Sequence, residues 1–268
     1  MNLHAELNTL PSDHPIASVI HNLFFLSRTS PSPFGRGARG EGKFPNLNIK
    51  ITSTIPVACG LGSGAAVTVA LTRALSSHIH YPMTDEEVNS FAYEIEKLHH
   101  GTPSGIDNTV VTYAKPVYFV KGHPIETFKV SRPFTIVIGN TGISAPTKES
   151  VGDVRKLWEA DREKWESVFD KVGEIAKQAR SVIESGKWKK LGDLMNENHV
   201  LLQEMTVSSP ELDKLVSAAC NAGALGAKLS GGGRGGNMIA LVEADQAEAV
   251  AKSLMGAGAR DTIITQVS

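Results

Sequence analysis

The sequence predicts a mixed α+β fold. Segments with apolar residues at helical spacing and segments of alternating β-branched residues both occur, without the strict alternation that typifies α/β proteins. At 268 residues the chain is long enough for one large domain or two smaller ones, and it contains no internal repeat.

The composition is that of a neutral cytoplasmic protein. A formal net charge of -1 and a pI near 6.8 give no electrostatic basis for binding nucleic acid or an anionic membrane. Cys59 and Cys220 are too few for a disulfide framework or a cysteine-ligated metal site. Met1–Leu10 lacks the pattern of a signal peptide, and no apolar run is long enough to span a bilayer. We therefore expect a cytoplasmic location, with no nucleic-acid and no membrane partner.

The first elements are a helix and a polar insertion. Apolar residues recur at helical spacing over Pro15–Ser27. Residues 28–43 are rich in Pro, Gly, Ser and Arg, with almost nothing to bury, and are expected to form a disordered insertion. Arginine-glycine segments can bind RNA, but a short one in a neutral chain is more typical of an insertion.

A strand, a glycine turn and two helices are expected next. Asn48–Ile55 alternates and is β-branched, which predicts a strand. Gly60–Ala66 is a glycine turn, and Ala65–Ser77 has the content of a buried helix. Thr84, followed by three acids, is typical of an N-cap that opens a helix running to about His99.

The remaining elements follow from periodicity and from the glycines that interrupt it. A long charged helix is expected, with Gly186 as its stop, followed by shorter helices and strands. The expected strands are Val110–Val120, Phe134–Gly139, Asn237–Val242 and Asp261–Val267, and the expected helices are Val151–Glu184, Leu191–Gln203, Pro210–Ala222 and Ala244–Met255.

Two carboxylates flank a Gly/Pro/Ser turn between Glu96 and Asn108. A helix cannot easily run through Gly101, Pro103 and Gly105, so the chain must loop there. Such a pair suits a division of labour in which one carboxylate binds a divalent cation and the other handles a proton. The neighbours His99 and His100 are interpreted as polar loop residues, because no further His or Cys stands at ligand spacing.

Pro56–Ala66 is a candidate phosphate loop. Its three glycines let the backbone approach a ligand, and the N-terminus of the following helix favours an anion. Gly60, Gly62 and Ala65 also satisfy a loose dinucleotide fingerprint, although the acid that should end the next strand is missing. A nicotinamide-dependent oxidoreductase therefore stays an alternative.

Lys228–Gly236 is a second glycine loop. Ordering five glycines in six positions costs considerable chain entropy, which indicates close backbone approach to another group. Paired with the first loop, it is interpreted as a lid or brace over phosphates. A flexible hinge is the alternative, and Arg234 either adds charge there or is solvated.

These segments together resemble the GHMP kinase superfamily. Pro56–Ala66 matches the superfamily's nucleotide loop with one change, and Gly226–Gly236 matches its C-terminal glycine motif. His100–Asn108 (HGTPSGIDN) is similar to the mevalonate kinase pattern, and Asn140–Val154 resembles the start of the second domain. The resemblance covers roughly Asn48 to the C-terminus. It implies an N-terminal ribosomal-S5-like α/β domain over 1–130, shortened at its start, and a ferredoxin-like α+β domain over 131–268.

The resemblance also implies an activity, which is phosphorylation of the mevalonate 5-hydroxyl by ATP and Mg²⁺ in isoprenoid precursor synthesis. Asp107 would be the catalytic base or a hydroxyl-orienting carboxylate, and Glu96 would hold Mg²⁺. Ser63 would contact phosphate or metal. The implied nucleotide contacts are Pro56, Val57, Ala58, Cys59, Gly60, Leu61, Gly62, Ser63, Gly64, Ala65, Ala66, Ser104, Gly231, Gly232 and Gly233. The implied substrate contacts are His100, Gly101, Thr102 and Thr147, the last facing substrate or phosphate.

The sequence departs from the family pattern at two places. No lysine-bearing strand that would place a lysine beside the catalytic aspartate is found before Asn48, and Gly64 stands where a second serine is usual. A catalytically weak relative therefore stays an alternative, as do phosphomevalonate, homoserine and sugar kinases. A homodimer stays open as the assembly state.

Overall fold

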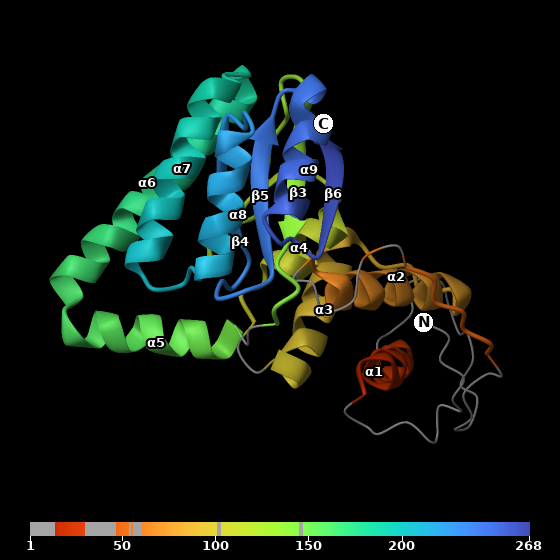
Figure 1. The fold of residues 1–268 in the computed structure, drawn as a ribbon. Helices are drawn as coiled ribbons and strands as arrows, with labels where there is room; N and C mark the ends of the chain where they lie inside the picture. Colours follow the sequence, from red (N-terminus) through yellow and green to blue (C-terminus); the bar gives the residue numbers. More distant parts are fainter. Residues whose placement is uncertain (1–13, 30–46, 54, 56–60, 101–102, 145–146) are drawn as a thin grey trace. The chain divides into compact units, whose positions relative to one another are not determined.

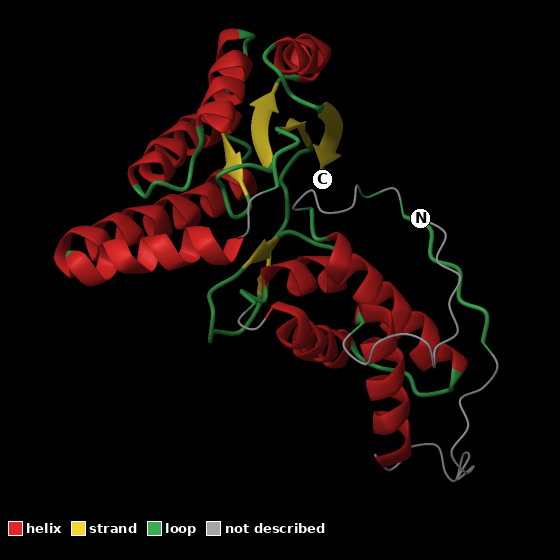
Figure 2. Ribbon diagram, turned by 60° about the horizontal axis from the view of Figure 1, so that its bottom comes forward, coloured by secondary structure: helices red, strands yellow, loops and turns green. Residues whose placement is uncertain are grey.

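The computed structural model describes residues 14–29, 47–53, 55, 61–100, 103–144 and 147–268. The chain divides into two compact units, residues 1–57 with 62–126 and residues 58–61 with 127–268. Mixed helix and sheet content confirms the α+β prediction, and Figure 2 shows that strands are few in the first unit. The expected boundary at residue 130 stays a prediction. Over the described residues, no helix is both long and apolar enough to cross a membrane.

The first unit is built around four helices. They are α1 (Pro15–Thr29), α2 (Ser63–His78), α3 (Asp85–His100) and α4 (Ile106–Tyr113), followed by the short strand β1 (Val117–Tyr118). Strand β2 (Glu126–Thr127) contains the last residue of this unit and the first residue after it. Helices α1, α2 and α3 bury a shared apolar cluster that includes Leu23, Leu75 and Ile95. Helix α3 begins with the expected cap: Glu87 N–H donates to Thr84 Oγ1, and Thr84 N–H donates to the Glu87 carboxylate.

The second unit is an antiparallel sheet covered by helices on both faces (Figure 1). Its strands run in the order β4-β5-β3-β6, with β3 paired to both β5 and β6. The strands are β3 (Phe134–Asn140), β4 (Gly226–Ser230), β5 (Asn237–Val242) and β6 (Asp261–Val267), and the helices are α5 (Thr147–Ala160), α6 (Arg162–Ser185), α7 (Trp188–Glu204), α8 (Pro210–Asn221), η2 (Ala244–Gln246) and α9 (Ala247–Gly256).

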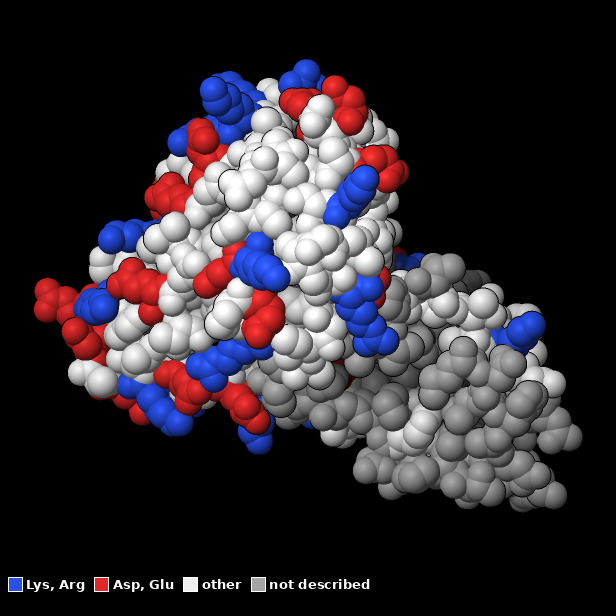
Figure 3. All heavy atoms as spheres, viewed as in Figure 1, with Lys and Arg blue, Asp and Glu red and all other residues white. Residues whose placement is uncertain are grey.

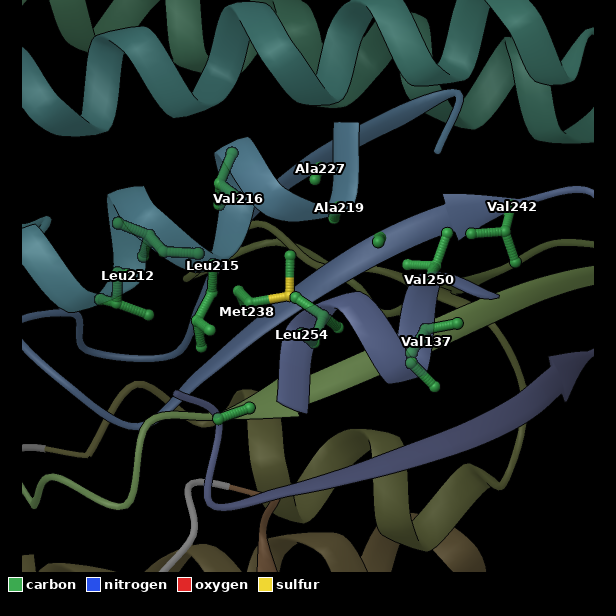
Figure 4. Packing of buried hydrophobic residues seen from close by; sticks show 14 of the residues in the cluster. Val137, Leu212, Leu215, Val216, Ala219, Ala227, Met238, Val242, Val250 and Leu254 are labelled. Carbon is green, nitrogen blue, oxygen red and sulfur yellow. The ribbon is translucent and has the colours of Figure 1, made fainter. Parts of the chain in front are cut away.

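Alternation along the strands separates two apolar layers. Val137 of β3 and Met238 of β5 point to the face covered by α8 and α9, where Leu215 and Leu254 meet them (Figure 4). Their neighbours, such as Leu241, point to the opposite face and pack with α6 and α7. Because both faces of the sheet are buried, this unit contains the main apolar core of the described chain.

Helix α7 takes the place of a neighbouring strand along β4. Gly192 of α7 lies so close to Gly226 of β4 that a Cβ on Gly192 would overlap the Leu225 carbonyl group. This close approach of helix and strand lets two side chains of α7 accept backbone N–H groups of β4. Asn196 Oδ1 accepts the Ala227 N–H at 2.9 Å, and His199 Nδ1 accepts the Leu229 N–H at 3.4 Å. The edge amides of β4 are thereby satisfied without another strand.

The buried His199 is suited to this acceptor role in its neutral form. Burial lowers the pKa of His199, although Asp213, whose carboxylate lies 3.2 Å from Nε2, opposes the shift. If His199 were protonated, Nδ1 would also carry a hydrogen and could no longer accept the Leu229 N–H. The neutral imidazole is therefore the form that this contact requires.

Three secondary-structure predictions were wrong. Of the expected strand Val110–Val120 only β1 (Val117–Tyr118) is a strand. The first four residues of that segment end α4, because Gly105 starts a helix whose buried residues, Asn108, Thr109 and Thr112, follow helical spacing. The expected helix 151–184 is two helices, since Asp161 leaves the helical conformation and its side chain accepts the Lys164 N–H to cap α6. The third error concerns β4: its residues 228–230 were expected to belong to the glycine loop, but they continue the strand.

The expected strand Asn48–Ile55 is also not formed in its described residues. The alternation is real, since Leu47, Ile49 and Ile51 are half-buried while Asn48 and Lys50 are exposed. Leu47 and Ile49 pack on the cluster of α1–α3, but no described strand pairs with them. A strand needs a ladder partner as well as a pattern. Helix α1 extends through Thr29, and residues 30–43 of the expected insertion lie outside the described residues.

Replacing Gly192 with alanine is expected to destabilise the second unit by about 1–3 kcal/mol, because the new methyl group would overlap backbone that is held in the sheet. Gly173→Ala in α6 is the matched control. Its Cβ would meet nothing within 4 Å, so the free energy of unfolding should rise by about 1 kcal/mol. Chemical denaturation measures both, and equal stability of the two variants would contradict the close contact.

Candidate active site

The N-terminus of α2 presents open backbone N–H groups. Gly62 is the N-cap residue, in the left-handed conformation with φ 68°, and no side chain among the described residues caps the helix. A Cβ on Gly64 would meet nothing within 4 Å, so space is open beside the first turn. Uncapped N–H groups at the positive end of a helix are a suitable site for a phosphate.

Asp107 lies next to this helix start. A Cβ built on Gly62 would be 3.8 Å from both Cβ and Cγ of Asp107 and 4.0 Å from Val111. Asp107 is exposed in the first turn of α4, where the helix dipole favours a carboxylate. The structure thus brings Gly62, at the described end of the glycine loop, next to one of the two carboxylates that the sequence singled out.

A buried polar network fixes the start of α4. Asn108 Nδ2 donates to Asn89 Oδ1 at 2.6 Å, and Thr109 Oγ1 donates to the Gly105 carbonyl at 2.6 Å. Gly105 has φ 87°, and a Cβ there would press on the rings of Tyr93 and Phe119 at 3.3 and 3.4 Å. These contacts set the direction in which the residue between them, Asp107, leaves the helix. Ser104 Oγ accepts the Ile106 N–H at 3.3 Å.

The second unit carries another glycine loop, residues 231–236, which packs on Thr147 at the start of α5. A Cβ on Gly232 would lie 2.5 Å from Thr147 Oγ1, so only glycine allows this approach. Gly233, with φ 76°, faces the Val207 carbonyl so closely that a Cβ could not be placed. Thr147 and Gly232 are therefore neighbours, whereas Gly233 lies against the α7–α8 connection.

A half-buried lysine lies at the entry to this loop. Lys228 Nζ donates to the Leu229 carbonyl at 2.8 Å. Burial lowers the pKa of Lys228 to about 8. The strand end from which the loop leaves is thus held at Leu229 by two side chains, Lys228 and His199.

Several expected site residues fall outside the described part of the chain. They are Pro56, Val57, Ala58, Cys59, Gly60, Gly101 and Thr102, together with the side chain of His100. Glu96 is half-buried on α3, one turn before the helix ends. Among the described residues no group of three His, Cys, Asp or Glu side chains could hold a metal ion. A Mg²⁺ ion that is bound largely by phosphates and water does not need such a group.

Surface charge adds no further candidate on the visible face. Acidic and basic side chains are interspersed there (Figure 3). An open hollow of about 510 Å³ in the second unit is lined by Arg132, Lys187, Lys189 and Lys190 but also by Asp193 and Glu243. Arg132 already donates to the Gly186 carbonyl and lies over the Trp188 ring. The mixed lining gives this hollow no clear ligand.

The sequence did not reveal which distant residues support the site. Asn89, Tyr93 and Phe119 around α4, and Thr206 and Val207 beside the second loop, contact the motifs from segments with no distinctive pattern. Of the supporting residues, Asn108 was signalled by its position beside Asp107.

Comparison with known proteins places this geometry in a family. The model of the GHMP kinases N terminal domain matches residues 34–115, and that of the GHMP kinases C terminal domain matches residues 179–260. The chain belongs to the GHMP kinase family. A mevalonate kinase of Pyrococcus abyssi is 41% identical over 231 residues, which cover 84% of this chain and 68% of that protein.

Solved structures agree with this membership. The crystal structure of L. major mevalonate kinase in complex with R-mevalonate is 37% identical, with a TM-score of 0.71, and the match covers 77% of this chain and 65% of that one. A phosphomevalonate kinase of Streptococcus pneumoniae, in complex with phosphomevalonate and AMPPNP, matches the fold over 100% of this chain with a TM-score of 0.75 at 17% identity. The chain thus spans about two thirds of the length of the mevalonate kinases it matches, and the predicted fold class is confirmed.

Alanine at Gly62 and at Gly64 should have opposite effects. Gly62→Ala forces a methyl group into the left-handed conformation, so we expect a loss of about 1–2 kcal/mol in the free energy of unfolding. Gly64→Ala fills open space within a helix and should be neutral or stabilising by up to about 1 kcal/mol. Thermal denaturation of the two variants measures the difference; a stabilised Gly62→Ala would contradict the assigned cap.

Proposed function

We propose that this chain transfers the γ-phosphoryl group of ATP to the 5-hydroxyl of mevalonate. The observation that carries the proposal is the position of the Asp107 side chain beside Gly62, at the open N-terminus of α2. Phosphoryl transfer needs a phosphate held by fixed donors and an acceptor hydroxyl held in line with it. A carboxylate next to a phosphate-binding helix start can orient that hydroxyl or accept its proton.

Similar proteins support mevalonate as the acceptor. The relative from Pyrococcus abyssi is a mevalonate kinase at 41% identity, and the L. major structure at 37% identity contains R-mevalonate. The phosphomevalonate kinase at 17% identity supports the fold alone. Family membership favours a kinase over a dinucleotide-dependent oxidoreductase, while homoserine, sugar and phosphomevalonate kinases remain competitors for a substrate panel.

Each remaining site residue has a proposed role. The first N–H groups of α2, with Ser63 Oγ, hold phosphate oxygens, and Gly231, Gly232 and Gly233 contact the nucleotide. Thr147 contacts phosphate or substrate. Glu96 and Ser63 offer the hard oxygen ligands that Mg²⁺ prefers, and the bound cation neutralises charge on the phosphates. The domain boundary at 130, the homodimer and the cytoplasmic location stay predictions.

Asp107→Asn is expected to lower kcat for mevalonate phosphorylation by at least about 100-fold, because the amide cannot accept the hydroxyl proton. Binding of Mg-ATP, measured by thermal shift, should persist. Asp85→Asn is the control, since Asp85 is likewise an acid in a first helical turn but forms an exposed pair with Arg73. Comparable kcat in Asp107→Asn and the unmodified chain would refute the proposed role.

Glu96→Gln is expected to raise the Mg²⁺ concentration needed for half-maximal turnover, because an amide oxygen is a weaker ligand than a carboxylate. A Mg²⁺ titration at fixed ATP measures the shift. Glu94→Gln on the same helix is the control, because Glu94 pairs with Lys97 at the surface. An unchanged titration in Glu96→Gln would remove Glu96 from the proposed metal site.

A further inference from the structure

The second glycine loop contains one large side chain, Arg234, with a strained backbone. Its φ is 58°, in the left-handed region that non-glycine residues seldom adopt. The β-branched Thr206, with φ 60°, lies beside it in the chain between α7 and α8. Strain of this kind costs about 1–3 kcal/mol per residue and tends to persist where function requires it.

Arg234 connects three segments of the second unit. Its backbone N–H donates to the Val207 carbonyl at 2.8 Å, and its Nε donates to the Thr206 carbonyl at 3.2 Å. Its Nη1 reaches Asp153 Oδ2 of α5 at 2.6 Å. One residue thus joins the glycine loop to the α7–α8 connection and to α5.

Helix α5 depends on contacts of this kind. Of its 14 residues only Ser150 is fully buried, whereas Val154, Leu157 and Trp158 are partly buried against the core. Thr147 at its first position touches Gly232, and Asp153, about 9 Å further along the helix, is bonded to Arg234. Helix α5 therefore contacts the glycine loop at two places, through Thr147 at Gly232 and through Asp153 at Arg234.

We propose that Arg234 is a positioning residue that, through Asp153, fixes the start of α5 against the glycine loop and so keeps Thr147 beside Gly232. The inference rests on the proposed function, in which Thr147 and this loop contact the nucleotide or substrate. Arg234 itself points to Asp153 and Thr206 and acts on the site through them.

A second cation on the same carboxylate provides a matched control. Lys156 Nζ lies 2.8 Å from Asp153 Oδ1, but Lys156 belongs to α5 itself, three residues further on. Lys156 and Arg234 together lower the pKa of Asp153 to about 2, so the carboxylate is ionised at neutral pH. The Lys156 pair cannot attach α5 to the loop, whereas the Arg234 pair can.

The test compares Arg234→Ala, Asp153→Ala, the double variant and Lys156→Ala in the full chain. Hydrogen exchange without ligand should become faster over 147–153 in the first three, and kcat/KM for ATP should fall by about 10- to 100-fold, with little change in the unfolding midpoint. The double variant should be no worse than Arg234→Ala, because that single variant has already lost the contact with Asp153. Lys156→Ala should behave like the unmodified chain.

Unchanged exchange over 147–153 in Asp153→Ala, or equal losses in Lys156→Ala, would overturn the positioning role. Asp153→Ala keeps the test decisive if Arg234→Ala does not fold, since the Asp153 side chain is half-exposed. Absence of turnover in the unmodified chain would refute the proposed function instead. The exchange measurement would still decide whether Arg234 holds α5.

Discussion

The backbone contact between α7 and β4 is the constraint on which the second unit depends. Gly192 and Gly226 lack the side chains that would separate helix and strand. That approach brings Asn196 and His199 to the edge amides of Ala227 and Leu229. The end of β4 is fixed as a result, and the glycine loop begins there.

Each unit holds candidate site residues around a glycine. Gly62 in the first unit adopts the left-handed conformation beside Asp107, and Gly232 in the second lies so close to Thr147 that a Cβ would overlap its side chain. Around these glycines the structure is held by specific polar contacts, such as Asn108 with Asn89 and Arg234 with Asp153. Open N–H groups and rigid surroundings are what electrostatic preorganisation requires.

Local signals in the sequence predicted most helices and the longer strands. Thr84 with Glu87, and Gly186 in the left-handed conformation, are caps that act within one turn of chain. The errors arose where distant contacts decide. Helix α4 forms despite its β-branched residues because Asn89 and Tyr93 hold its start. Segment β4 is a strand because α7 covers its edge.

The candidate site shows the same limit. Glycine loops and acids were visible in the sequence, and the proximity of Gly62 to Asp107 agrees with the motif resemblance. The partner of Arg234, Asp153, lies 81 positions away along the chain. The local sequence therefore could not decide whether the Arg234 side chain adds charge to the loop or is solvated.

The break at Asp161 has a thermodynamic consequence. It makes α5 a helix with its own boundaries, and with one fully buried side chain it can open at a smaller free-energy cost than the sheet and its covering helices. Any ligand that contacts Thr147 binds only the docked state of α5. Its apparent affinity is the intrinsic affinity multiplied by the docked fraction, so contacts remote from the ligand set part of its dissociation constant.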